Sequence, residues 1–230
     1  MGEIVSWGQS LLLATTVTLR VALGALALGL LWGLLGATAK LSSVRALRWL
    51  ADAYTTINRG VPELLIILIA YYGGTITLTR LLRLIDPQTQ YVEIPAMAAG
   101  IFSLSLVFGA YATEAFRGAI LAIPTGQIEA AMAVGMPPWL IFRRIKLPQM
   151  WRFALPGLGN NWISLVKDTS LVSTVGLDDL MRVSKLAANV THQHFQFLSC
   201  AALIYLSLTV VNTAALARLE RRANRGVRRD

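Results

Sequence analysis

The stretch EAAMAVGMPPWLIFRRIKLP, residues 129–148, is a basic loop between two long apolar segments. Its Ala-rich beginning predicts a short helix over residues 126–134. Gly135 and the two prolines that follow would end this helix, because glycine frees the backbone and proline lacks a hydrogen-bond donor. A second short helix is predicted over residues 139–147 and would stop at Pro148. Two short helices joined by a tight turn could form a rigid projection that fits a groove on a partner.

Long apolar runs dominate the rest of the chain. Of its 230 residues, 55% are hydrophobic and 14% are charged, which is typical of an integral membrane protein. The net charge of +9 is also compatible with nucleic-acid binding. However, the cations cluster beside the apolar runs and in the C-terminal tail, as they do on the cytosolic side of membrane proteins. We therefore expect contact with membrane lipid and no nucleic-acid partner.

Five segments are predicted to span the membrane, giving an all-α integral membrane protein with a single domain over residues 1–230. Each approaches or exceeds the roughly 20 residues needed to cross about 30 Å of hydrocarbon. The fourth segment is the least apolar and is assigned partly from its context. The predicted spans are residues 10–37, 61–82, 95–120, 153–176 and 197–216.

The positions of Lys and Arg predict an N-terminus outside and a C-terminus inside. This orientation places residues 129–148 in the cytosol. Few cations would lie on the other side, namely Arg80, Arg83, Arg182 and Lys185. The cytosolic set comprises Lys40, Arg45, Arg48, Arg59, Arg117, Arg143, Arg144, Lys146, Arg152, Arg218, Arg221, Arg222, Arg225, Arg228 and Arg229.

Two segments between the spans also predict helices. Residues 42–58 alternate basic and apolar positions at helical spacing, so they form either an interfacial helix or the cytosolic start of a long second span. Pro62 biases Val61 away from helical angles and predicts a break there. Residues 177–196 are polar and mixed, and they predict a short surface helix on the outer side.

Metal binding and disulfide formation find little support in the sequence. Cys200 is the single cysteine and lies in an apolar run, so a disulfide within the chain is impossible. His192 and His194 offer too few ligands for a closed metal site. We expect them to be solvated loop residues and expect no metal site.

Polar residues inside the predicted spans are costly and therefore need partners. Asn161, Ser164 and Asp168 fall on one face of the fourth span and would point toward an interior pathway. Lys167 and Asp168 could instead pair with neighbouring spans without touching a substrate.

Glu63 follows Pro62 in an apolar stretch, where an unpaired carboxylate would be expensive. Its partner could be Arg59, Arg20 or a cation that passes along the pathway. Glu114 and Arg117, one helical turn apart, are predicted to form a local pair.

The 129–148 loop resembles the EAA loop of permease subunits in ATP-binding-cassette (ABC) importers. The matching positions are Glu129, Ala130, Ala131, Gly135, Ile145, Leu147 and Pro148. Further matches at Arg59-Gly60-x-Pro62, at Arg117-Gly118 and across residues 156–171 extend the resemblance over residues 15–222. Among such permeases it is most similar to those for histidine, lysine, arginine and ornithine and for opines.

The resemblance implies a transport subunit rather than an enzyme, located in a bacterial inner membrane. The EAA loop would dock on a cytosolic ATPase dimer, which would bind ATP and magnesium; this chain would bind no cofactor. A second permease, identical or homologous, and a periplasmic amino-acid-binding protein would complete the importer. The sequence has no phosphate-binding G-x-x-x-x-G-K-[ST] loop, which agrees with ATP binding by a separate subunit.

The resemblance also suggests a role for Glu63, as the partner of a basic substrate. Asn161, Ser164 and Asp168 would line the same pathway. Two alternatives stay open. The importer could carry glutamine or glutamate, which would leave Glu63 without a ligand. The chain could also be a membrane scaffold that recruits a cytosolic partner without transport.

Overall fold

The computed structural model describes residues 2–224, and this part of the chain is helical with short connections. The predicted tail cations Arg225, Arg228 and Arg229 lie outside the described residues. The α-helices are α1 (Gly2–Lys40), α2 (Arg45–Gly60), α3 (Glu63–Leu68), α4 (Gly74–Ile85), α5 (Ala96–Leu121), α6 (Thr125–Ala133), α7 (Pro138–Ile141), α8 (Leu147–Asp168), α9 (Leu180–Thr191) and α10 (His194–Ala223). Two π-helical turns, η1 (Ile69–Gly73) and η2 (Phe142–Lys146), and a 3₁₀ turn, η3 (Thr169–Val175), connect some of them.

Four helical segments of the described chain are long and apolar enough to cross a membrane. They are Ser6–Lys40, Glu63–Ile85, Ala96–Leu121 and His194–Ala223, and they overlap the first, second, third and fifth predicted spans. The chain is therefore a multi-pass membrane protein by the length and composition of its helices.

The fourth predicted span differs from the structure at its outer end. α8 has 22 residues but ends at Asp168, and the chain continues as the 3₁₀ turn η3 instead of as an α-helix to Gly176. Thr169 and Thr174 direct their hydroxyls at the carbonyls of Val166 and Leu171, both at 2.7 Å. Side chains that bond to nearby backbone in this way compete with the regular helix.

A stripe of glycines on α1 packs against α5 and sets the spacing of the two helices. A Cβ atom built on Gly33 would lie 2.6 Å from the Cβ of Ala112, and one on Gly29 would lie 2.7 Å from the Phe108 ring. Small residues allow two helix backbones to approach closely, which is a main source of packing energy between membrane helices. The α1–α5 pair is therefore specified by residues that lack a side chain.

Replacement of Gly33 by valine should separate α1 from α5 and destabilise the protein. Overpacking of this kind costs about 1–3 kcal/mol, so a lower melting temperature is expected for the detergent-purified protein. Gly8→Val is a matched control on the same helix, because no atom lies within 4 Å of its added Cβ. Equal melting temperatures for the two variants would contradict the role assigned to the stripe.

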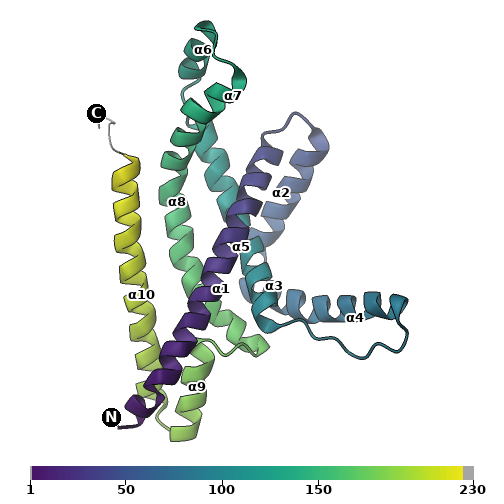
Figure 1. The fold of residues 1–230 in the computed structure, drawn as a ribbon, viewed down its shortest axis with the longest axis vertical. Helices are drawn as coiled ribbons and strands as arrows, with labels where there is room; N and C mark the ends of the chain where they lie inside the picture. Colours follow the sequence, from purple (N-terminus) through teal and green to yellow (C-terminus); the bar gives the residue numbers. More distant parts are fainter. Residues whose placement is uncertain (1, 225–230) are drawn as a thin grey trace.

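α8 packs on another side of α5, and α10 stands beside α8 with few buried residues (Figure 1). The core between α1, α5 and α8 is built from aliphatic and aromatic side chains such as Val21, Leu104, Phe116 and Leu158. A smaller cluster joins the start of α1 to α9 and α10 around Leu180 and Phe197. The predicted helix within residues 177–196 is confirmed as α9, but one face of it is buried instead of lying on the surface, namely Leu180, Ser184, Ala187 and Ala188.

Asp179 is a fully buried carboxylate at the start of α9. One oxygen accepts a hydrogen bond from the Arg182 N–H at 3.0 Å, while Oδ2 has no hydrogen-bond partner in the described part of the chain. Burial raises the pKa of Asp179 to about 6. The folded state therefore holds this proton more tightly than the unfolded chain, whose Asp pKa is about 3.9.

This raised pKa predicts a stability that depends on pH. Between about pH 4 and 6 the folded state binds more protons, so the contribution of Asp179 favours folding in acid and is lost as the pH rises through about 6. Asp179→Asn keeps the capping oxygen and should raise the melting temperature at pH 7.5 while flattening its dependence on pH between 4 and 7. Asp178→Asn, at a side chain that is 78% exposed, is the control. An unchanged pH profile in the Asp179 variant would contradict the assignment.

An ion-pair network ties three helices together near the α5 C-terminus. Lys40 of α1 lies 2.9 Å from Asp52 of α2 and 2.5 Å from Glu114 of α5. The predicted pair of Glu114 and Arg117 is confirmed at 2.9 Å. The Lys40 side chain is only 11% exposed, so both carboxylates compensate a largely buried charge.

α2 runs along α1 and α5, with Ala51 and Thr55 buried, and it ends at the predicted break. Val61 is extended (φ −98°, ψ 135°), which confirms the effect expected of Pro62. Between α2 and α4 the chain changes direction, and α4 extends sideways, away from the bundle and across the direction of α8 and α10 (Figure 1). The start of α1 and the end of α10 lie near opposite ends of the molecule, and α6 and α7 project at the end where α10 finishes (Figure 1).

Candidate functional site

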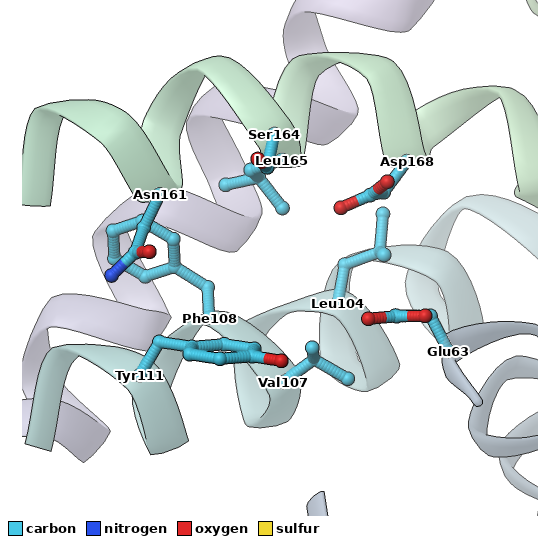
Figure 2. A pocket seen from close by; sticks show the side chains of 9 residues that line it. All are labelled: Glu63, Leu104, Val107, Phe108, Tyr111, Asn161, Ser164, Leu165 and Asp168. Carbon is cyan, nitrogen blue, oxygen red and sulfur yellow. The ribbon is translucent and has the colours of Figure 1, made fainter. Parts of the chain in front are cut away.

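A cavity of about 290 Å³ lies between α3, α5 and α8. The four residues predicted to line a pathway all border this cavity. Figure 2 shows Glu63 and Asp168 at one end of it, with Asn161 at the other end. The lining residues are Glu63, Leu104, Val107, Phe108, Tyr111, Asn161, Ser164, Leu165 and Asp168.

Local sequence explains how each polar group reaches the cavity. The Val61–Pro62 break starts a new helix, so Glu63 is the first residue of α3, where unpaired backbone N–H groups favour a carboxylate. On α8, Asn161, Ser164 and Asp168 fall on one face because they are separated by three and four residues. That face is turned toward α5 across the cavity (Figure 2).

The cavity contains two carboxylates and no basic side chain in its lining. The described residues show no salt bridge from Glu63 to Arg59 or Arg20, the two structural partners considered for it, and none from Asp168 to Lys167. Arg59 instead lies over the ring of Tyr111, at 5.4 Å from its centroid. Two carboxylates facing one space repel each other, so the cavity favours a cationic guest.

Sequence reasoning missed the contribution of α5. Phe108 and Tyr111 lie one helical turn apart and form the apolar and aromatic wall opposite α8 (Figure 2). Aromatic residues in an apolar span carry no signal of their own, because the same residues also build ordinary cores.

The predicted first helix and turn of the 129–148 loop are present. α6 ends in a backbone pattern in which Gly135 N–H bonds to Met132 O at 2.9 Å and Met136 N–H bonds to Ala131 O at 3.0 Å. Gly135 has φ +77°, a left-handed conformation that glycine adopts without strain. The turn after α6 therefore depends on glycine at this position.

The surface of this loop combines polar and large apolar residues. Glu129, Ala130 and Gly135 are exposed, whereas Ala131 is buried. Sequence reasoning missed four apolar side chains here, of which Val134 and Trp139 are 77% and 67% exposed. The other two are Met132 and Phe142, and the Phe142 ring stacks on Trp139 at 6.0 Å. Clustered exposed apolar residues of this kind mark a surface that another protein or a membrane covers.

The predicted end of the second helix at Pro148 is wrong. α7 continues through the π turn η2 into α8, and Pro148 lies in the first turn of α8. Leu147 N–H bonds to Phe142 O, five residues back, so the hydrogen-bond register has already changed before the proline. Proline is tolerated in a first turn because its missing N–H is not needed there. Ile145 and Leu147 are half-buried, and Pro148 is exposed.

A family profile described as "Binding-protein-dependent transport system inner membrane component" matches residues 25–225. The chain belongs to this permease family. It is 46% identical over 222 residues to the nopaline transport system permease protein NocQ of Agrobacterium fabrum, covering 96% of this chain and 94% of that one. It is 45% identical to the histidine/lysine/arginine/ornithine transport system permease protein HisQ of Salmonella typhimurium, covering 93% and 92%. The predicted family is confirmed, and with it a transport subunit rather than an enzyme.

Solved structures of permeases agree with the fold. The chain matches a subunit in the crystal structure of an amino acid ABC transporter with histidines, with a TM-score of 0.81, 31% identity and coverage of 95% and 96%. A second match, in the MetNI methionine ABC transporter, has a TM-score of 0.67 at 20% identity and supports the permease fold alone.

Proposed function

We propose that this permease forms part of an ABC importer that carries basic amino acids or opines into the cytoplasm. We infer the substrate class from the cavity between α3, α5 and α8. Glu63 and Asp168 face this cavity, and its lining holds no basic side chain. A guanidinium or ammonium group would balance these charges in a site of low dielectric. The names of the nopaline and histidine/lysine/arginine/ornithine relatives support the same class.

The polar groups of the cavity suggest how such a substrate is held. Glu63 and Asp168 would bind its cationic group at one end. Asn161 and Ser164 would offer hydrogen bonds further along α8, and the ring of Tyr111 would pack against its aliphatic part. Glutamine or glutamate, the alternative substrates, would leave both carboxylates without a cation.

The 129–148 loop is proposed as the docking site for a cytosolic ATPase dimer, which binds ATP and magnesium. Exposed Glu129, Ala130 and the apolar cluster around Trp139 support this role, because they project at one end of the bundle. We propose the N-terminus outside and the C-terminus inside, as the positions of Lys and Arg favour, with α8 as the fourth of five crossings. That α1 starts and α10 ends at opposite ends of the molecule agrees with an odd number of crossings. One permease domain over residues 1–230, a second permease and a periplasmic binding protein complete the proposed importer in a bacterial inner membrane.

The first test is purification of the tagged chain from its native membrane in mild detergent, followed by mass spectrometry. Recovery of an ABC ATPase and a homologous permease is expected, and an ATPase without a second permease would indicate a homodimer. Absence of an ATPase, under conditions that preserve a known importer, would contradict transport and favour the scaffold alternative.

The second test identifies the substrate class. The purified complex is reconstituted with its binding protein, and ATP hydrolysis is measured with arginine, lysine, glutamine and glutamate. Stimulation by arginine or lysine is expected. Stimulation by glutamine or glutamate alone would overturn the substrate class while leaving the importer itself intact.

A further inference from the structure

The helix α4 leaves the bundle and presents an apolar face that no other helix of the described chain covers. Its principal packing partner is the preceding turn η1. On this apolar face Leu81 and Ile85 are 56% and 84% exposed. Leu84, 82% exposed, lies beside it toward Arg80. Leu78, Leu81 and Ile85 recur at helical spacing on one face, and Arg83, two residues from both Leu81 and Ile85, lies almost opposite. A helix of this kind is amphipathic.

One flank of α4 is occupied by the chain that follows it. The Thr79 hydroxyl accepts a hydrogen bond from Val92 N–H at 3.1 Å, and the Thr75 hydroxyl accepts one from Ile94 N–H at 3.2 Å. Glu93, between them, accepts a hydrogen bond from the Tyr71 hydroxyl. These bonds hold residues 92–94 along α4 and satisfy backbone groups that hydrocarbon would otherwise leave unpaired. On the Arg face, Arg83 Nε donates a hydrogen bond to Thr89 O at 3.1 Å. The apolar face remains uncovered by the described residues.

The chain has already passed from one end of the bundle to the other before α4 begins. α2 lies beside the ion-pair network of Lys40, Asp52 and Glu114 and runs along α1 and α5. α3 then packs against η3, the turn that follows the far end of α8. α2 and α3 together can therefore supply the second membrane crossing, and α4 is not needed to complete it. The direction of α4, across the other helices, is that of a helix in the membrane plane (Figure 1).

We infer that α4 lies flat in the membrane–water interface, with Leu81 and Ile85 in the hydrocarbon and Arg80 and Arg83 at the lipid phosphates. Interfacial helices combine an apolar face with basic residues in this way. Two exposed tyrosines, Tyr72 just before α4 and Tyr91 just after it, are 52% and 63% exposed. Tyrosine is enriched at the same depth of a bilayer. On the orientation proposed above, this is the outer surface.

The inference is tested by placing single cysteines, in a Cys200→Ala background, at Leu81, Ile85 and Arg83 of the assembled complex in lipid nanodiscs. Each is labelled with a small fluorophore and quenched either by lipids brominated on the acyl chain or by aqueous iodide. Probes at Leu81 and Ile85 should be quenched at least about twofold more by brominated lipid than the probe at Arg83, which iodide should reach. Leu203, 63% exposed on α10, is the hydrocarbon reference, and Gln88 is the aqueous reference.

Two outcomes would overturn the inference. Equal quenching of all three α4 probes by iodide would place α4 in water. Protection of Leu81 and Ile85 from both quenchers, with cross-links to the second permease, would make the apolar face a protein interface. The measurement does not depend on transport. If the Leu203 probe also failed to report lipid, the proposed membrane arrangement would fail rather than the placement of α4.

Discussion

Uptake of arginine or lysine should fall about tenfold or more when Glu63 is replaced by glutamine, while uptake of a neutral amino acid changes far less. Glu63 and Asp168 face the same cavity, and its lining holds no basic residue. Removing one partner of a desolvated charge pair costs about 2 kcal/mol or more, and 1.4 kcal/mol already corresponds to a factor of ten. Glutamine keeps the size of the side chain and one acceptor oxygen, so the loss chiefly reports the charge.

The measurement is initial uptake into proteoliposomes that contain the complete complex, at equal protein levels. Asp178→Asn, which removes an exposed carboxylate outside the cavity, is the matched control and should leave uptake unchanged. If Glu63→Gln lowered uptake of basic and neutral amino acids by the same factor, Glu63 would have a structural role and the basis of the substrate proposal would be lost.

Replacement of Gly135 by valine should uncouple ATP hydrolysis from amino-acid uptake. Gly135 has φ +77°, and its N–H and that of Met136 close the turn after α6. A side chain in this left-handed conformation costs roughly 1–2 kcal/mol, so the turn should rearrange and move the exposed surface of α6 and α7. We expect uptake to fall about tenfold or more, while ATP hydrolysis by the complex persists without stimulation by substrate.

The control for this variant is Gly126→Val in α6. An added Cβ at Gly126 meets no atom within 4 Å, and this glycine has no positive φ. Glu129→Lys tests the same surface without touching the turn, because Glu129 is exposed and reversal of its charge should weaken docking. Normal coupled transport by both Gly135→Val and Glu129→Lys would remove this loop from the mechanism.

The sequence predicted the parts of the candidate site that depend on local periodicity. Asn161, Ser164 and Asp168 share a face because helical spacing fixes it, and Pro62 breaks the helix before Glu63 by a local steric rule. Phe108 and Tyr111 were missed because their place in the cavity depends on how α5 packs, which the close α1–α5 contact at Gly33 and Ala112 helps to set. No periodicity within α5 contains that information.

Two further features were beyond the sequence. Hydropathy reports that residues 63–85 are apolar enough to cross a membrane, as the structure confirms, but it does not report the direction of the helix axis, so the course of α4 could not be predicted. Pro148 was taken as a helix end because proline usually is one. The π turn η2 shifts the hydrogen-bond register ahead of it, and such turns have no clear composition signal.

Because α7 continues through η2 into α8, a movement of the exposed loop can displace the residues at the cavity. At 1.5 Å per residue, residues 138–168 form a lever about 45 Å long, from the exposed loop to Asp168 at the cavity. A tilt of about 5° at the loop would displace the far end by about 4 Å over that length, comparable to the size of the group that a carboxylate holds. The ladder of hydrogen bonds is interrupted along this lever at η2 and at Pro156. Those are the two points at which such a lever would bend.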